Sequence, residues 1–420
     1  MIVGIIGSGG REHAICEKIY NSRRTKKIYC FPGNGGTAGI AENINIAPNN
    51  IIELKKFILK KKIDLVIVGP EQPLVDGIVD NLSKSNIKVF GPSKIASQLE
   101  GSKIFTKDIC KKYNIPTANF GIFKDKRSAI KFIKKTKLPI VVKADGLAAG
   151  KGVYICESIR SAENSINEIF NGKFGKAKNV LIEEFLKGEE MSYFIISDGK
   201  TFKKFQTAQD HKRVFEGDKG PNTGGMGCYS PSRLINKKID KKILKRIINP
   251  TLKALKKLGT GYQGFLYAGL MIVKKNPYLI EYNVRMGDPE CQTILPLLKN
   301  DFLDLIDSCC AGKLSKTPIK WKDKKSICVV LCSKGYPNKY KNVVKINNLH
   351  KILHTKNNFL FHGGTKLIKN NFFSNGGRVL NFVSLSKKFG VCRKNIFKSI
   401  KKLNWANGFF RKDIGHKVIK

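Results

Sequence analysis

Long apolar runs are missing from this sequence. No stretch of its 420 residues approaches the roughly 20 consecutive apolar residues that a membrane-spanning helix needs. The first apolar segment ends at Ile6, and Gly, Arg, Glu and His follow within a few residues, which does not fit a secretory signal peptide. We therefore expect a cytoplasmic protein without a membrane partner.

Paired cysteines are also missing. The eleven cysteines are scattered, with no C-x-x-C motif and no spacing to histidine that is typical of zinc sites. Cys328 and Cys332 are four residues apart, but no second half-site accompanies them. These spacings argue against a zinc finger and a disulfide scaffold, and we expect reduced thiols.

Acidic residues are scarce: 32 Asp and Glu stand against 78 Lys and Arg, which gives a net charge of +46. Such a charge can indicate a nucleic-acid binder. However, the lysines are spread along the whole chain beside Ile, Asn and Phe, as an AT-rich genome encodes by default, without the aromatic and basic interleaving of a single-strand-binding groove. We expect a solvated basic surface and no specific nucleic-acid partner, with a non-enzymatic nucleic-acid binder as the alternative.

What is present is a regular alternation of short apolar strands and helical stretches over residues 1–101. Strands are expected at residues 1–6, 28–31, 63–68 and 87–90. This alternation predicts a parallel α/β domain, with the loops at 7–10 and 69–73 at the carboxyl edge of its sheet.

The loop after the first strand reads GSGGREHA. It nearly matches the dinucleotide fingerprint, but Glu12 stands where the third glycine should be, and no acidic residue follows the second strand. A nicotinamide enzyme is therefore disfavoured. A strand, a glycine turn and a helix still present backbone N–H groups to an anion, which makes Gly9, Gly10 and Arg11 candidates for phosphate binding, with a plain tight turn as the alternative.

Residues 140–156 read IVVKADGLAAGKGVYIC. Two apolar segments flank a small-residue loop, but the spacing of its glycines and the strand after Lys151 do not fit a Walker P-loop. The pattern predicts a glycine-rich hairpin flap. Its N–H groups, with Lys143 and Lys151, could cover nucleotide phosphates. Residues 209–231 are too polar and too rich in glycine for a core element, and we interpret them as a substrate loop.

Residues 278–292 read YLIEYNVRMGDPECQ. Alternation places Glu281, Asn283 and Arg285 on one face of a strand, where a carboxylate and an amide oxygen suit Mg2+ and the guanidinium suits a phosphate. An exposed polar strand face is the alternative. Asp288 is expected at the N-cap of the following helix and Pro289 at its first position.

The remaining chain predicts a helix at 237–258, a strand before residue 273, and a polar segment at 312–325. Strands at 327–333, 358–364 and 377–385, with a helix at 392–403, suggest a small α+β domain that ends in FFRKDIG. These boundaries divide the chain into residues 1–101, 102–325 and 326–420.

The motifs GSGGREHA, GPEQPLVDG, KADGLAAGKGV, the 209–231 loop and RMGDPECQ follow one another along the chain. In this order the chain resembles the phosphoribosylamine-glycine ligases, the glycinamide ribonucleotide synthetases, which are ATP-grasp enzymes. It departs from the family pattern at two positions. Met286 stands where the family usually has Phe or Leu, and Cys228 stands where it has Ala or Pro. The resemblance implies an ATP-grasp core at 102–325 with a mobile flap subdomain at about 120–190, and a monofunctional enzyme, which we expect to be a monomer.

The resemblance also implies sites. ATP would bind with Mg2+ or Mn2+, and the expected nucleotide contacts are Lys143, Gly150, Lys151, Gly152, Glu183, Glu184, Phe185, Leu186 and Glu190. The metal would bind Glu281 and Asn283, and catalysis would use Arg285, Lys151, Asp210 and Lys212. The substrates would contact Gly9, Gly10, Arg11, Pro221, Asn222, Thr223, Gly224, Gly225, Met226 and Gly227. Residues 265–273 on the preceding strand carry no carboxylate, so the metal would depend on Glu281.

The implied reaction joins glycine to 5-phosphoribosylamine through glycyl phosphate, giving glycinamide ribonucleotide, ADP and phosphate in purine biosynthesis. Neither step needs a protein nucleophile, so positioning and charge neutralisation would carry catalysis. Another ATP-grasp ligase, acting on a purine precursor through a carboxy or formyl phosphate, is the nearest alternative, and the 209–231 loop argues against it.

Overall fold

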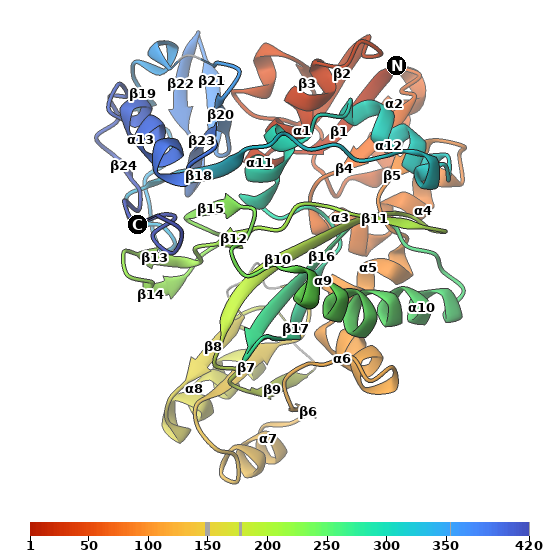
Figure 1. Ribbon diagram of the computed structural model, residues 1–420, viewed down its shortest axis with the longest axis vertical. Coiled ribbons are helices and arrows are strands. Elements are labelled where there is room, and N and C mark those ends of the chain that lie inside the picture. Colours follow the sequence, from red (N-terminus) through yellow and green to blue (C-terminus); the bar gives the residue numbers. More distant parts are fainter. Residues whose placement is uncertain (148–151, 176–178, 353, 420) are drawn as a thin grey trace.

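The computed structural model describes residues 1–147, 152–175, 179–352 and 354–419 (Figure 1). A parallel α/β domain and a small α+β domain lie side by side at one end, and two antiparallel sheets with their helices form the rest. The predicted fold class is confirmed. No helix among the described residues is long and apolar enough to cross a membrane.

The first domain contains a five-stranded parallel sheet in the order β3-β2-β1-β4-β5. Its strands are β1 (Ile2–Gly7), β2 (Lys27–Pro32), β3 (Glu42–Asn43), β4 (Leu65–Val68) and β5 (Lys88–Phe90). Val3 and Ile5 pack with Ile15 of α1 (Gly10–Tyr20) in one hydrophobic cluster, while Ile6 packs with Leu54 of α2 (Ile51–Lys60) in another. Helices therefore cover both faces, as is usual for a parallel sheet.

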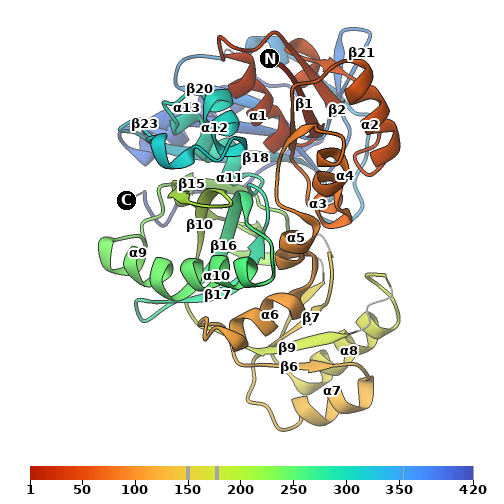
Figure 2. The same ribbon diagram turned by 90° about the vertical axis from the view of Figure 1, so that its right-hand side faces the viewer.

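The flap is a four-stranded antiparallel sheet with its own hydrophobic core. Its order is β6-β9-β7-β8, from β6 (Phe120–Phe123), β7 (Ile140–Ala144), β8 (Val153–Cys156) and β9 (Val180–Glu184). Two helices, α7 (Lys126–Ile133) and α8 (Ile159–Phe170), cover its outer face (Figure 2). Strands β7 and β8 pair as the predicted hairpin, whose tip, including Gly150 and Lys151, lies outside the described residues.

The second core sheet has the order β11-β10-β16-β17 and carries the 278–292 stretch at its edge. Its strands are β10 (Glu189–Asp198), β11 (Phe202–Lys204), β16 (Gln263–Val273) and β17 (Asn276–Asn283). The predicted helix at 237–258 is α9 (Lys237–Ile243), a π turn (Leu244–Ile248) and α10 (Asn249–Lys257). It lies beside β16 and β17 (Figure 2). Helices α5 (Lys94–Gly101) and α6 (Lys103–Lys112) follow β5 of the first domain in the chain and contact β17 of this sheet.

The 209–231 loop is more regular than expected and belongs to two sheets. It contains β12 (Gln209–Asp210), β13 (Arg213–Phe215), β14 (Lys219–Asn222) and β15 (Gly227–Ser230). Strands β13 and β14 form a small hairpin, whereas β12 and β15 extend the sheet of the last domain. That sheet continues through β18 (Lys325–Ser333), β23 (Arg378–Ser386) and β20 (Asn358–His362), with β24 (Gly408–Phe409) on β18 and α13 (Phe389–Ile400) beside it. Three short strands, β19 (Lys345–Ile346), β21 (Thr365–Ile368) and β22 (Asn371–Ser374), complete the domain.

One local prediction at the end of β17 is wrong. The helix α11 (Glu290–Ile294) has Pro289 as its N-cap, and the Asp288 side chain makes no capping hydrogen bond to it. Instead, Asp288 Oδ2 accepts from the backbone N–H of Arg11, at 3.0 Å, in the first turn of α1. The Asp288 carboxylate thus caps α1 of the first domain and not α11. This is possible because a carboxylate can accept from an unpaired backbone N–H in the first turn of either helix.

The first and last domains meet at buried histidines. The N–H of His362 donates to Nδ1 of His13 at 2.8 Å, and the Asn34 amide donates to the carbonyl oxygen of His362 at 2.8 Å. Burial, with the neighbouring His362, lowers the pKa of His13 well below its usual range, and burial lowers the pKa of His362 to about 3. Both rings are therefore neutral at physiological pH.

Replacing His13 with alanine should lower the free energy of unfolding by about 1–3 kcal/mol, because the buried N–H of His362 loses its acceptor. Both folded-state pKa values lie below the unfolded value of about 6.5. The contribution of the two neutral histidines to the free energy of unfolding is therefore fully present above about pH 6.5. It is lost as the pH falls toward 3. Urea titrations between pH 4 and pH 8 measure both effects, and His13→Ala should flatten the pH dependence.

His350→Ala is the matched control. This histidine is exposed, so its removal should change stability by less than about 0.5 kcal/mol. Equal losses in the two variants would contradict a specific role for the His13 contact.

Candidate active site

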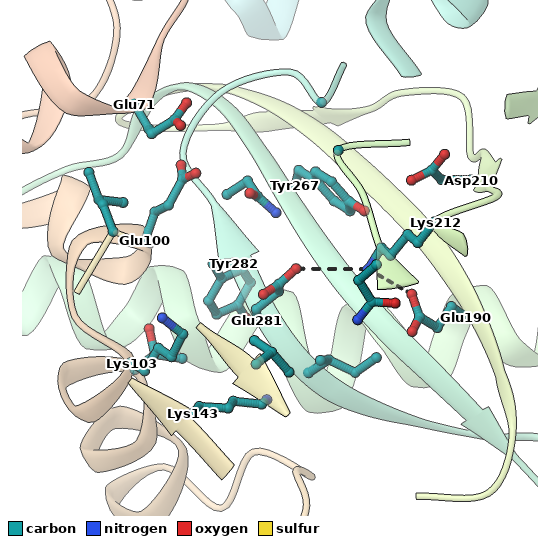
Figure 3. A pocket seen from close by; sticks show the side chains of 18 of the residues that line it. Glu71, Glu100, Lys103, Lys143, Glu190, Asp210, Lys212, Tyr267, Glu281 and Tyr282 are labelled. Atoms are coloured by element: carbon teal, nitrogen blue, oxygen red, sulfur yellow. Dashed lines mark ion pairs between the residues drawn. The ribbon is translucent and has the colours of Figure 1, made fainter. Parts of the chain in front are cut away.

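A cavity of about 600 Å³ lies where the first domain, both core sheets and the 209–231 loop converge. Figure 3 shows Lys103 and Lys143 on one side and Lys212 with Glu190 on the other, with Glu281 between them. Expected site residues that line it are Gly9, Arg11, Lys143, Glu183, Glu184, Phe185, Leu186, Glu190, Asp210, Lys212, Asn222, Thr223, Gly224, Glu281, Asn283 and Arg285. The structure thus brings together residues that are far apart in the sequence.

The edge strand β17 supplies the cavity floor. Glu281 and Asn283 alternate with buried Tyr282, so both polar side chains reach the cavity. Opposite Glu281 on β16 stands Gly269, whose missing side chain leaves room for the carboxylate. The described residues contain no group of three or more His, Cys, Asp or Glu side chains that could hold a metal by themselves. The two oxygens fit Mg2+ only if phosphate and water oxygens complete its shell.

Arg285 lies between two carboxylates from other elements. Its Nη2 is 2.8 Å from Glu100 Oε1 and its Nε is 3.2 Å from Glu71 Oε2. The charge of Arg285 lowers the pKa of Glu71 to about 2, whereas burial raises the pKa of Glu100 to about 7. Burial would lower the pKa of Arg285, but the two carboxylates raise it, so the guanidinium stays charged. Sequence reasoning missed both partners, although Glu71 belongs to the GPEQPLVDG motif.

A second ionic group joins the flap to α6. The buried carboxylate of Glu183 pairs with the ammonium groups of Lys107 and Lys143. Burial would raise the pKa of Glu183, but the two lysines lower it, so it is ionised. Glu183 was expected at the adenine, yet its side chain contacts lysines, and the Glu184 carboxylate accepts hydrogen bonds from Asn119.

Lys107 was missed because the sequence gives no sign of a partner. It faces Glu183 only because α6 packs beside β9, and its Nζ also donates to Thr117 Oγ1 at 2.6 Å. Lys103, one helical turn earlier, donates to the Gly146 carbonyl at 2.8 Å. Spacing of four residues could have shown that both lysines share a face of α6.

Lys212 faces the metal-site candidate across the cavity. Its Nζ is 2.7 Å from Glu190 Oε2 and 4.0 Å from Glu281 Oε1 (Figure 3). Burial would lower the pKa of Lys212, but the carboxylates of Glu190 and Glu281 raise it well above its usual range. The charge of Lys212 in turn lowers the pKa of Glu190. Lys212 and Glu190 are therefore ionised together.

Asp210 carries a buried carboxylate oxygen, Oδ1, that has no hydrogen-bond partner in the described structure. Burial and the nearby charge of Glu290 raise the pKa of Asp210 well above its usual range. Gly225 has φ +112° and a side chain there would approach Asp210 Oδ1 within 2.7 Å, so only glycine fits. Glu290 itself is buried and accepts from Ser192 Oγ at 3.1 Å. Two carboxylates thus face one corner of the cavity.

The glycine turn after β1 is already occupied by protein groups. Glu12 Oε2 accepts from the N–H of Gly9 at 2.6 Å, and Arg11 pairs with Glu12 and with the Met286 carbonyl. The Arg11 guanidinium thus binds protein oxygens in this structure.

A second cavity of about 280 Å³ adjoins this turn, between the first and last domains. It is lined by Ser8, Gly9, Gly10, Pro32, Gly33, Asn34, Asp288, Gly363, Gly364, Thr365, Asn375, Arg378 and Asn381. Arg378, which sequence reasoning missed, also lines the large cavity, and its Nη1 donates to the Gly224 carbonyl at 2.6 Å. Its charge lies at the junction of the two cavities.

The remaining expected residues lie around these cavities. Gly225 leaves room for the Asp210 carboxylate, since it has no side chain. The N–H of Met226 donates to the His211 carbonyl at 2.9 Å, and Gly227 pairs with β18. Pro221 belongs to β14, and the Gly152 carbonyl accepts from Ala144 in the flap hairpin.

Comparison with known proteins shows which family has this architecture. The family models for phosphoribosylglycinamide synthetase match residues 1–100 (N domain), 101–291 (ATP-grasp domain) and 326–417 (C domain). A phosphoribosylamine-glycine ligase of Caldanaerobacter subterraneus is 45% identical over 416 residues, which is 99% of each chain. One of Mesorhizobium japonicum is 45% identical over 420 residues, covering 100% of this chain and 99% of its own.

Solved structures agree with these sequence matches. The phosphoribosylamine-glycine ligase of Thermotoga maritima has a TM-score of 0.86 and 32% identity, covering 99% of this chain and 100% of its own. The biotin carboxylase domain of a Hydrogenobacter thermophilus 2-oxoglutarate carboxylase, crystallised with MgADP, has a TM-score of 0.74 at 16% identity and covers 97% and 91%, which shows the shared fold alone. The chain belongs to the phosphoribosylglycinamide synthetase family.

Proposed function

We propose that this protein is a carbon-nitrogen ligase that joins glycine to 5-phosphoribosylamine with the conversion of ATP to ADP, a step of purine biosynthesis. Family membership over the full length supports the activity. The observation that carries the proposal is one cavity that collects lysines, arginines and carboxylates from three domains. Such a cavity suits a reaction in which three small molecules must meet.

The chemistry needs two transfers. A carboxylate oxygen of glycine attacks the γ-phosphorus of ATP, the bond to the β-phosphate oxygen breaks, and ADP leaves. The amine of phosphoribosylamine then attacks the carbonyl carbon of glycyl phosphate, phosphate leaves, and the amine loses a proton. Side chains need only position the reactants and neutralise charge.

We infer that ATP lies between the flap and the β10–β17 sheet. Lys143 and Lys103 reach this part of the cavity and would neutralise phosphate charge, while residues 183–186 and Glu190 would contact the nucleoside. Arg285 would face the transferring phosphoryl group from a fixed position, since Glu71 and Glu100 hold its guanidinium. Lys151 and Gly150 of the flap tip are retained in this proposal by the family resemblance alone.

Glu281 and Asn283 would hold Mg2+ or Mn2+. A bound cation would supply neutralisation of phosphate charge. The chain provides one carboxylate and one amide oxygen, and the Lys212 ammonium lies 4.0 Å from the Glu281 carboxylate.

Glycine would bind in the corner formed by Asp210 and Glu290. Two buried carboxylates, one with an unpartnered oxygen, call for a cationic ligand, and the α-ammonium of glycine is one. The charges of Lys212 and Arg378 oppose the rise in the pKa of Asp210, so both lie near this corner and would attract the carboxylate of glycine. Ion pairing would also keep the glycine amine protonated, so that it could not compete as a nucleophile.

The ribose phosphate would enter the smaller cavity beside the 7–10 turn, with Arg378 as its cation. This modifies the expectation from the sequence, in which Arg11 supplied the charge. Monomeric state, residence in the cytoplasm and the lack of a specific nucleic-acid partner stay predictions.

Turnover tests the proposed function directly. ADP release is measured with glycine plus freshly prepared phosphoribosylamine, and with each alone. Turnover that requires both substrates is expected, and ADP release that does not depend on glycine would refute the ligase assignment.

Glu281→Gln should reduce kcat by at least about 100-fold at a fixed Mg2+ concentration, because the candidate metal site loses its only side-chain charge. Raising Mg2+ should recover part of the activity. Glu157→Gln, at an exposed carboxylate on the flap, is the control and should retain activity. An active Glu281→Gln enzyme with the wild-type Mg2+ dependence would refute the metal assignment.

Lys143→Met should raise the KM for ATP by about 10–100-fold, since a charge-assisted hydrogen bond contributes about 1.5–3 kcal/mol. The KM for glycine should hardly change. Lys135→Met, at an exposed lysine of the same subdomain, serves as the matched control. If both variants keep the wild-type KM for ATP, Lys143 does not contact the nucleotide.

Asp210→Asn should raise the KM for glycine by about 10–100-fold and leave the KM for ATP near its wild-type value, because an ion pair to the ammonium is replaced by a neutral contact. Asp108→Asn changes an exposed carboxylate and provides the comparison. An unchanged KM for glycine would place the ammonium elsewhere.

A further inference from the structure

Residues 411–417, the RKDIGHK segment after β24, pack against the 209–231 loop. The Arg411 side chain is 1% exposed. Its Nη1 donates to the Arg213 carbonyl and to Asp218 Oδ1, both at 2.9 Å, and its Nε and Nη2 bind the two oxygens of Asp413 at 2.8 Å and 2.7 Å. One buried guanidinium thus joins the segment to β13 and to the turn that precedes β14.

Backbone hydrogen bonds strengthen this contact. Asp413 Oδ2 also accepts from the N–H of Gly217 at 2.9 Å, and Glu216 Oε1 accepts from the N–H of Lys412 at 3.1 Å. Both loop residues lie in the turn between β13 and β14. The segment therefore fixes the turn from two directions.

A third contact reaches His211, which stands between Asp210 and Lys212 in the chain. The N–H of Gly415 donates to His211 Nε2 at 3.3 Å, and Nδ1 lies 3.3 Å from the Gly227 carbonyl. For both bonds to form, the ring must be neutral, with its proton on Nδ1. Burial and the charge of Arg411 lower the pKa of His211 to about 4, which agrees with a neutral ring.

His211 also organises the backbone of the loop. Its N–H donates to the Gly227 carbonyl at 2.8 Å, and its carbonyl accepts from Met226 at 2.9 Å. The neighbouring Lys212 carbonyl accepts from the N–H and the hydroxyl of Thr223, each at 2.8 Å. The side chains on either side of His211, Asp210 and Lys212, are the ones that line the cavity.

We propose that the 411–417 segment, with Arg411 at its centre, is a positioning element of the active site: it holds the β13–β14 turn and His211 so that Asp210 and Lys212 reach the cavity. Arg411 acts through the loop and is not proposed to touch a substrate. The proposal rests on the proposed function, because the kinetics of that reaction report the positions of Asp210 and Lys212.

Charge explains how the element depends on pH. His211 faces Arg411, Lys417 and His416, which oppose its protonation, and Asp218, which favours it. Removing the charge of Arg411 should raise the pKa of His211 above about 4, while burial continues to hold it below the ordinary value of about 6.5. A protonated ring cannot accept from the Gly415 N–H, so the element should open at a higher pH in a variant without the Arg411 charge than in the wild type.

The experiment compares Arg411→Met with Arg411→Lys and Lys412→Ala in the full chain. Lys412 has an exposed side chain and only its backbone is used, so it should behave as wild type. Arg411→Met should lower kcat/KM for glycine by about 10–100-fold, as expected when a reacting group is slightly displaced. The KM for ATP should stay near wild type, and Arg411→Lys should recover part of the loss.

Two further readouts separate positioning from plain loss of folding. The activity of Arg411→Met should gain an acid limb at a pH above about 4, where the wild type keeps a neutral His211. Imidazole NMR should show His211 neutral down to about pH 4 in the wild type and protonated at higher pH in the variant. Should Arg411→Met fail to fold, Asp413→Asn, which keeps an acceptor for Gly217, is measured in the same way.

The outcomes distinguish a failure of the proposed function from a failure of the positioning element. A wild type without glycine-dependent turnover refutes the proposed function, and the NMR titration then tests the His211 contact independently. An active wild type with a folded Arg411→Met variant of unchanged kcat/KM and pH profile overturns the positioning element. Equal losses toward ATP and glycine, in step with a loss of stability, also overturn it.

Discussion

The active-site arrangement depends on one constraint: the cations Arg285, Lys143 and Lys212 that line the cavity are each paired with carboxylates from other parts of the chain. Arg285 of the β17 edge is held by Glu71 of the first domain and Glu100 of α5. An unpaired buried ion would cost several kcal/mol, so these elements can only pack in a way that brings opposite charges together. The large cavity is therefore surrounded by groups that are already oriented.

The same constraint explains the flap and the loop. Glu183 places Lys143 and Lys107 together, which ties a subdomain with its own hydrophobic core to α6. The 209–231 loop has little apolar surface of its own, and it gains order by adding β12 and β15 to the sheet of the last domain and by contact with Arg411. The sheet of the last domain and Arg411 thus hold this polar loop in a fixed position beside the large cavity.

Periodicity in the sequence predicted much of the architecture. The parallel sheet, the β7–β8 hairpin and the edge strand with Glu281 and Asn283 follow from local patterns, because a strand or hairpin buries one face by rules that adjacent residues satisfy. The Asp288 cap failed for the opposite reason. A carboxylate can serve either of two helices, and the sequence alone does not say which one lies closer.

The sequence by itself determined the local elements, the order of the motifs and the chemistry that their side chains could supply. Only the tertiary structure decided the pairing: that Lys107 meets Glu183, that Glu12 and Asp288 occupy the glycine turn, and that Arg378 is the cation between the two cavities. The physical reason is that propensity and periodicity act over a few residues, whereas electrostatic partners are chosen by packing between segments far apart in the chain.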